Sequence, residues 1–236
     1  MMKKLPLFLF VFCFWCAAPQ TAAAAIQVKQ LVYGPDESQV VDLYTAVPLP
    51  AEPMPTVVLA HGGLWQGGSR SEMETLCNNI ILQSNGAVAC ASIDYRLSDD
   101  LGGSCTDTGK DTYTDQARDL ALAYSMLQNN AEIHRIDPRR MHVGGHSAGA
   151  HLAHTLNLRW SEFAQPCNRP DGCPATLSAI GLEGIYNISA WNDYEAIRWQ
   201  SNFACATRKA FGAPGPSPAA CIDSGLGERC WDAGSP

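Results

Sequence analysis

The chain has 236 residues and a formal net charge of −7 at pH 7, from 16 lysines and arginines against 23 aspartates and glutamates. Hydrophobic residues make up 46% of the sequence, and the length suits one domain with a substantial core. The negative charge argues against nucleic acid or an anionic membrane surface as the partner.

The N-terminal segment predicts export. Met1-Met2-Lys3-Lys4 is basic, the following residues through Ala18 are apolar, and Ala23-Ala24-Ala25 offers small residues for cleavage. The apolar stretch is shorter than the about 18–20 residues that cross a bilayer, and no later segment approaches that length. We therefore expect a signal peptide over residues 1–25, a secreted or periplasmic protein, and one domain over residues 26–236 without a membrane span.

Apolar patterns at the start of this domain predict strands. Residues 26–33 and 39–47 alternate around the turn signal Gly34-Pro35-Asp36, which predicts an antiparallel hairpin. Residues 57–60 and 87–93 are continuous apolar runs, which are typical of strands covered on both faces.

Two segments have the spacing of helices with one buried face, over residues 73–81 and 115–130. Asp137-Pro138 predicts a break before the next strand, and residues 176–183 predict a further strand. Strands that alternate with helices imply right-handed crossovers and a parallel sheet, so we expect an α/β fold.

A serine lies between two glycines in Gly145-His146-Ser147-Ala148-Gly149, after an apolar run and before a helical one. A strand that turns sharply into a helix holds its corner residue in a strained conformation, and small neighbours leave room for that turn. The corner hydroxyl is then exposed beside a helix N-terminus, which favours developing negative charge. Ser147 is therefore the predicted nucleophile.

A second motif, His61-Gly62-Gly63-Leu64-Trp65, follows an apolar run. Acyl transfer passes through a tetrahedral oxyanion, which needs unobstructed backbone N–H donors. The N–H groups of this glycine pair, together with that of Ala148, are the predicted oxyanion hole. We expect His61 to shape the loop, whereas Trp65 either lines a pocket or packs in the core. The alternative is a glycine-rich turn without a chemical role.

Eight of the ten cysteines lie beyond residue 25, and an even count in an exported chain suggests disulfides. Cys167 and Cys173 bracket a turn-rich loop that a disulfide would close. Cys77 and Cys90 lie in apolar helix and strand patterns, where we expect buried free thiols. The C-terminal tail contains Cys205, Cys221 and Cys230. We expect two of these cysteines to pair with each other and one to pair with Cys105.

The sequence has no Cys-x-x-Cys pair and no His-Glu-x-x-His motif, so we expect no metal. His151 and His154 share one helix face, but a packed or solvated role is favoured over metal binding. No organic cofactor is required by the predicted chemistry.

These motifs resemble the α/β-hydrolase superfamily in its esterase/lipase branch, which includes carboxylesterases, feruloyl and acetyl esterases and kynurenine formamidases. The resemblance is carried by residues 61–65, Asp94-Tyr95-Arg96-Leu97, residues 136–140 and residues 145–153, which fall in the family's order. The last of these is particularly similar to the formamidases. The resemblance implies a mostly parallel sheet with helices on both faces and an antiparallel N-terminal hairpin.

Carried over by position, the resemblance makes Ser147 the nucleophile and places Gly62, Gly63 and Ala148 in the oxyanion hole. It gives Asp94 and Arg96 structural roles in the loop after their strand. The family's order is serine, then an acidic residue, then histidine.

After Ser147 the sequence contains His151 and His154, and both lie on the helix that starts at the serine. Side chains one turn along that helix point away from the corner, so neither suits a general base. We therefore expect the catalytic acid and histidine to be absent and the C-terminal part of the fold to be missing. The chain is then either a fragment of a serine hydrolase or a short pseudoenzyme that binds without catalysis.

The expected function is hydrolysis of a small-molecule carboxylic ester through an acyl-enzyme, impaired or absent in this chain because it lacks the base. The alternatives are an arylformamidase-like amidohydrolase and a non-catalytic binding protein with the same fold. The sequence does not indicate an oligomeric state.

Overall fold

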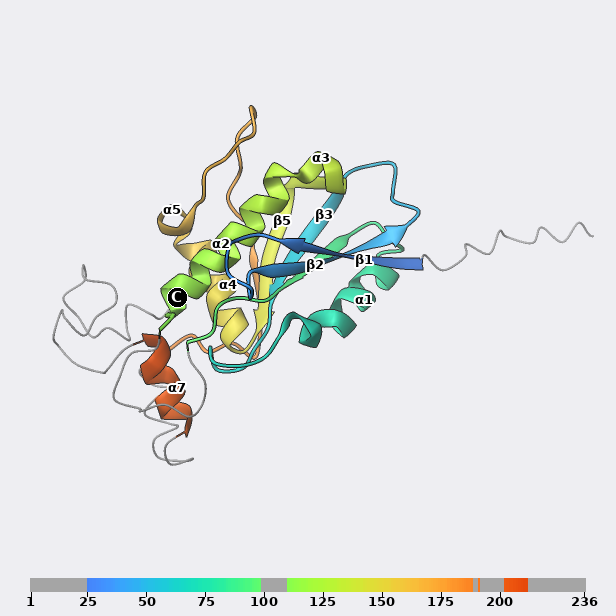
Figure 1. The fold of residues 1–236 in the computed structure, drawn as a ribbon. Coiled ribbons are helices and arrows are strands. Elements are labelled where there is room, and N and C mark those ends of the chain that lie inside the picture. The colour runs from blue at the N-terminus through green and yellow to red at the C-terminus, as the bar shows by residue number, and fades with distance from the viewer. Residues whose placement is uncertain (1–24, 99–109, 189–190, 192–201, 212–236) are drawn as a thin grey trace, which may run out of the picture.

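The computed structural model describes residues 25–98, 110–188, 191 and 202–211. A six-stranded sheet in the order β1-β2-β4-β3-β5-β6 forms its centre (Figure 1). The first two pairings are antiparallel and the other three are parallel, so the predicted mostly parallel sheet and N-terminal hairpin are confirmed. The strands are β1 Ala25–Val32, β2 Val40–Val47, β3 Met54–Ala60, β4 Ala89–Ile93, β5 Ile136–His146 and β6 Ala179–Leu182.

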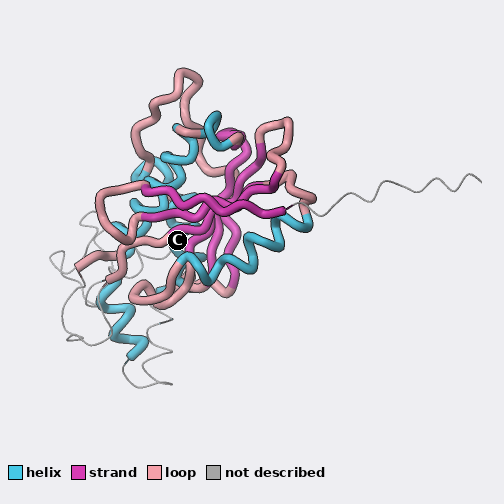
Figure 2. Tube along the Cα trace, turned by 45° about the vertical axis from the view of Figure 1, so that its right-hand side comes forward, coloured by secondary structure: helices cyan, strands magenta, loops and turns pink. Residues whose placement is uncertain are grey.

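Helices cover both faces of the sheet (Figures 1 and 2). On one face α1 packs against β2 and β4, and on the other α2 and α4 pack against each other and against β5. The α2 helix begins two residues before the predicted start because Thr112 and Asp115 form a capping box at its N-terminus. The helices are η1 Arg70–Met73, α1 Glu74–Gln83, α2 Tyr113–Asn129, α3 Ala131–His134, α4 Ala148–Leu158, α5 Trp160–Phe163 and α7 Asn202–Phe211.

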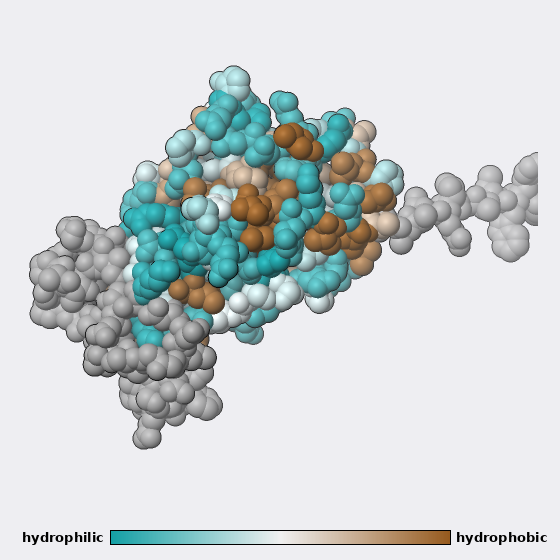
Figure 3. Space-filling view, viewed as in Figure 1, coloured by the Kyte–Doolittle hydropathy of each residue, from teal (hydrophilic) through white to brown (hydrophobic). Residues whose placement is uncertain are grey.

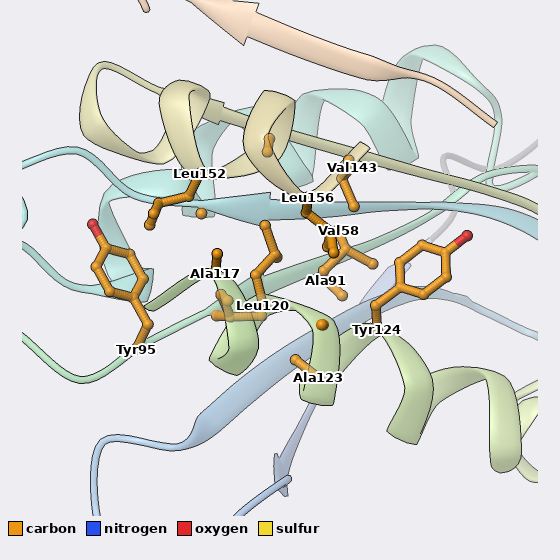
Figure 4. Packing of buried hydrophobic residues seen from close by; sticks show 14 of the residues in the cluster. Val58, Ala91, Tyr95, Ala117, Leu120, Ala123, Tyr124, Val143, Leu152 and Leu156 are labelled. Carbon is orange, nitrogen blue, oxygen red and sulfur yellow. The ribbon is translucent and has the colours of Figure 1, made fainter. Parts of the chain in front are cut away.

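The two faces of the sheet have separate cores. Leu120 of α2 and Leu156 of α4 lie with Val58 of β3 in the larger core (Figure 4). The next residue along β3, Leu59, belongs to the smaller core under α1. Successive side chains of a strand point to opposite faces, so a strand buried on both sides needs an unbroken apolar run.

A disulfide joins α1 to β4, between Cys77 and Cys90, and both residues are 0% exposed. The expectation of free thiols at these positions was wrong. The buried face of α1 packs directly on β4 and brings the two Cα atoms to 5.2 Å, which is within the range that a disulfide spans.

The predicted disulfide between Cys167 and Cys173 is present, with a Cα–Cα distance of 5.6 Å. Cys205 on α7 is also disulfide-bonded. Cys105, Cys221 and Cys230 lie outside the described residues.

The predicted chain break at Asp137-Pro138 was wrong, because β5 already begins at Ile136. Ile136 pairs with Met54, whereas Thr56 pairs with Met141, so β5 has a bulge around the proline. A bulge places residues without ladder partners inside a strand, and it therefore accommodates a residue that has no N–H to donate.

The surface in the view of Figure 3 mixes polar side chains with scattered apolar ones. Exposed apolar residues on the outer hairpin include Val28, Val32 and Val47. Within the described ranges, no helix is long and apolar enough to cross a membrane. Residues 1–24 lie outside these ranges, so the signal peptide stays a prediction.

Candidate active site

Ser147 lies at the corner between β5 and α4. Its backbone has φ 53° and ψ −116°, in the left-handed region that non-glycine residues rarely adopt. The N–H of Ser147 donates to the Leu182 carbonyl at 2.8 Å, which ties the corner to the end of β6. The sharp turn predicted from the sequence is therefore present.

The glycines on either side of this corner have no room for a side chain. A Cβ at Gly145 would lie 2.4 Å from the carbonyl carbon of Gly149. A Cβ at Gly149 would lie 2.1 Å from the carbonyl oxygen of Ala60, at the end of the neighbouring strand β3. Helix α4 can start this close to β3 because both positions lack a side chain.

The loop after β3 brings Gly62 to the serine. A Cβ at Gly62 would lie 3.3 Å from the Ser147 Cβ, so the two residues face each other directly. The next three residues have positive φ angles: 107° at Gly63, 55° at Leu64 and 62° at Trp65. The Gly63 carbonyl accepts hydrogen bonds from the N–H groups of Gln66 and Gly67, which closes this tight loop.

The His61 ring supports the loop from its buried side. Its Nδ1 lies 2.7 Å from the carbonyl oxygen of Gly62, and burial lowers the pKa of the imidazole. His61 is 1% exposed, so its imidazole packs inside the protein, where burial disfavours the charged form. The loop-shaping role stays a prediction, and the approach of Nδ1 to the Gly62 carbonyl is the contact through which it would act.

Trp65 is fully buried and packs edge-on against His151 and Phe211, with ring centroids 5.4 and 4.8 Å away. Its backbone carbonyl accepts a hydrogen bond from Gln116 on α2 at 2.8 Å. Of the two predicted alternatives, core packing is the one observed.

The two histidines after the serine pack against aromatic rings. His151 is 0% exposed and contacts the rings of Trp65 and Tyr113. The Nδ1 of His154 lies 3.0 Å from the Ala150 carbonyl oxygen, and its ring packs edge-on against Tyr186. Across the described part of the chain, no three His, Cys, Asp or Glu residues come together as metal ligands.

Asp94 and Arg96 anchor the segment after β4. Asp94 accepts a hydrogen bond from the Arg70 backbone N–H at 2.6 Å, and the Arg70 guanidinium also bonds it. Arg96 forms an ion pair at 2.7 Å with Asp119 of α2, whose side chain is buried. These contacts agree with the structural roles that the resemblance implied.

A cavity of about 580 Å³ opens beside Ser147. Most of its wall comes from the segment after β6, of which only Glu183 was predicted from the sequence, as the last residue of a strand. The missed signal is Glu183-Gly184, a charged residue and a glycine at the carboxyl end of a parallel strand, where ligand sites form in α/β sheets. The lining residues are His146, Ser147, Glu183, Gly184, Ile185, Tyr186, Asn187 and Trp191.

A second cavity, of about 430 Å³, lies at the opposite end of β5 and is lined by residues such as Arg135, Asp137 and Arg139. It contains none of the predicted site residues. The cavity beside Ser147 is therefore the candidate active site.

The fold, the Ser147 corner at this cavity and the glycine loop beside that corner define an α/β-hydrolase of the esterase/lipase branch. The chain belongs to the BD-FAE family, which matches residues 41–202.

Similar proteins of known name are esterases and a formamidase. Esterase LipC of Mycobacterium tuberculosis is 26% identical over 165 residues, which cover 70% of this chain and 38% of LipC. Kynurenine formamidase of Danio rerio is 30% identical over 159 residues, which cover 66% of this chain and 45% of the formamidase. The chain therefore spans less than half the length of these curated relatives.

Solved structures share the fold. A bacterial heroin esterase matches with a TM-score of 0.60 at 20% identity, covering 81% of this chain and 56% of that one. Esterase LipW of Mycobacterium marinum matches with a TM-score of 0.57 at 20% identity, covering 83% of this chain and 57% of LipW.

Proposed function

We propose that the chain is the nucleophile-bearing part of an exported serine esterase that cleaves small-molecule carboxylic esters. The observation that supports this most directly is the contact between Ser147 and Gly62. Ala60, which immediately precedes the glycine motif, pairs between β3 and β5 with Gly145, the first residue of the serine motif. The register of the sheet therefore brings Ser147 beside the glycine loop, which supports the proposed role of both.

In the proposed reaction, the Ser147 oxygen attacks the ester carbonyl while a base removes its proton. The oxyanion is stabilised by the N–H groups of Gly62 or Gly63 and of Ala148, the first residue of α4. The alcohol then leaves with a proton, and water hydrolyses the acyl-enzyme. We do not assign the base to His151 or His154, because His151 packs among aromatic rings and the Nδ1 of His154 lies beside the Ala150 carbonyl.

The glycine loop explains why backbone donors suit this site. A side chain at Gly62 would occupy the space next to the serine, and one at Gly63 would lie 2.1 Å from the Gly67 carbonyl oxygen. Removing one oxyanion donor typically costs about 3–4 kcal/mol of transition-state stabilisation, so the loop geometry is a substantial part of the proposed catalysis.

An arylformamidase-like reaction is the second candidate. The 30% identity to the Danio rerio formamidase favours it. The same nucleophile and oxyanion donors would act on a formamide, and a comparison of rates on ester and formamide substrates in a full-length relative would separate the two activities.

Binding of a matched ligand pair tests the proposal on this chain even if turnover is slow. A trifluoromethyl ketone forms a tetrahedral adduct with an active serine, whereas the methyl ketone with the same alkyl chain binds without one. We expect the wild type to prefer the trifluoromethyl ketone at least about tenfold, with an adduct signal in ¹⁹F NMR.

Ser147→Ala should lose both the preference and the adduct signal, and Ser178→Ala, on the segment before β6, should keep both. Equal binding of the two ketones to the wild type would contradict the proposed function.

A further inference from the structure

His146 lies next to the glycine loop, the Glu183 carboxylate and the cavity beside Ser147. A Cβ at Gly62 would lie 2.8 Å from the His146 Nδ1 and 3.3 Å from the Ser147 Cβ, so the imidazole and the serine both border Gly62. The other ring nitrogen, Nε2, lies 3.2 Å from a carboxylate oxygen of Glu183. His146 also lines the cavity beside the serine.

The sheet fixes the position of Glu183 relative to His146. His146 is paired with Leu182 in the parallel register of β5 and β6, and Glu183 follows directly. The Ser147 N–H bond to the Leu182 carbonyl holds the same strand end. The carboxylate is therefore presented to the ring by backbone hydrogen bonds, although the Glu183 side chain itself is 87% exposed.

Glu183 also has an unusual backbone. Its φ of 52° lies in the left-handed region, although the next residue, Gly184, could adopt such an angle without strain. Strained non-glycine residues persist only where the surrounding structure holds them, and they cluster at functional sites. The Glu183 carboxylate lies 3.2 Å from the His146 Nε2, and a carboxylate can only accept, so Nε2 is the donor of this hydrogen bond and Nδ1 is the ring nitrogen that borders Gly62.

The glycine loop also needs support on the side that faces His146 and Ser147. Three consecutive residues, from Gly63 to Trp65, have positive φ angles, and such a loop is stable only when its surroundings hold it. On the buried side, the His61 ring supports it. On the side of Gly62 where a Cβ would lie, the nearest group is the imidazole of His146, whose Nδ1 would be 2.8 Å from that Cβ.

We propose that His146, oriented by Glu183, is a positioning residue that holds the Gly62 end of the oxyanion loop against Ser147. This inference rests on the proposed function, because it assigns His146 a role in stabilising the oxyanion. It extends that function by naming a histidine–carboxylate pair that acts through the loop and takes no proton from the serine.

The test measures the binding of the same two ketones to His146→Ala, in the full chain. Displacing the loop weakens tetrahedral adducts more than ordinary ligands, because misplacement by about 1 Å can cost about 100-fold. We expect trifluoromethyl ketone affinity to fall about 10- to 100-fold, with methyl ketone affinity within about twofold of wild type.

Two further variants separate positioning from general loss of structure. His146→Gln retains a donor that can reach Glu183 and should recover most of the lost affinity, and Glu183→Gln should produce a smaller loss of the same kind. The matched control is His142→Ala on the same strand, whose ring bonds Ser178 at 2.9 Å, and it should leave the preference unchanged.

A His146→Ala protein that keeps the wild-type preference for the trifluoromethyl ketone would overturn the inference and leave the proposed function intact. A parallel loss of affinity for both ketones, with a lowered melting temperature, would also overturn it, because the effect would then be on folding. A wild type without any preference would overturn the proposed function itself.

Discussion

The imidazole of His61 and the phenol ring of Tyr95 are stacked, with ring centroids 4.3 Å apart and planes 12° from parallel. The Tyr95 hydroxyl also donates to the backbone carbonyl of His61 at 2.9 Å. Both residues are buried, and they follow the adjacent strands β3 and β4. The segment after β4 therefore supports the glycine loop after β3.

Replacing Tyr95 by phenylalanine should lower the free energy of unfolding by about 1–2 kcal/mol, because it leaves the buried His61 carbonyl without this donor. Urea unfolding measures the loss. Trifluoromethyl ketone affinity should fall as well, since the loop is less firmly held. Tyr124→Phe removes a bond to the Met141 carbonyl inside the larger core and should affect stability alone. Equal effects of the two variants on ketone binding would contradict this account.

Gly149→Ala should be severely destabilising, by about 2–3 kcal/mol or more, because its Cβ would overlap the backbone of β3. Gly67→Ala is the matched control: its Cβ would have no neighbour closer than the Gly63 oxygen at 3.8 Å. It should change the free energy of unfolding by less than about 1 kcal/mol. Thermal unfolding of both variants tests the difference, and a stable Gly149→Ala protein would show that α4 does not start as close to β3 as described.

The buried His61 should make folding sensitive to acid. Burial lowers its pKa in the folded protein, so below the unfolded-state pKa of about 6.5 the unfolded chain binds a proton that the folded one excludes. This contribution to stability is present above pH 6.5 and is lost as the pH falls below it, with a slope of at most about 1.4 kcal/mol per pH unit.

Urea unfolding at pH 7.5, 6.5 and 5.5 measures this slope, and His61→Gln should flatten it. His134, whose pKa burial also lowers, keeps its own contribution in that variant. Identical slopes in the wild type and His61→Gln would show that His61 takes up its proton while folded.

The disulfide between Cys77 and Cys90 should contribute about 3 kcal/mol, as expected for a loop of this length. The double variant Cys77→Ala, Cys90→Ala should lose that amount and leave a cavity under α1 as well. The matched control, Cys167→Ser with Cys173→Ser, opens a shorter surface loop and should lose about 2 kcal/mol. A larger loss of unfolding free energy in the Cys167→Ser, Cys173→Ser variant than in the Cys77→Ala, Cys90→Ala variant would contradict the prediction.

The sequence predicted the residues of the site whose roles depend on an unusual backbone conformation. Ser147 and the glycines of the two motifs need particular conformations, and small residues at fixed spacing indicate these conformations directly. The hairpin and the buried strands were predicted for a similar reason, because burial on one or two faces determines the spacing of apolar residues.

The missed parts depend on contacts between distant segments. The pairing of Cys77 with Cys90 requires knowing that α1 packs on β4, and their apolar neighbours indicated only burial. Similarly, the contact between Tyr95 and His61 joins two loops whose proximity follows from strand order. Glu183 becomes part of the cavity because β6 pairs with β5, which a single short apolar run cannot indicate.

The pairing of Ala60 with Gly145 fixes one part of the site through the sheet, and the rest of the site lies outside the sheet. The pairing of β3 with β5 determines where Ser147 lies relative to the backbone amides of the glycine loop. Residues 183–187 supply much of the cavity wall, and they follow the end of β6. If the proposed function holds, loop exchanges confined to residues 184–187 should change ester selectivity and leave Ser147 and Gly62 in place.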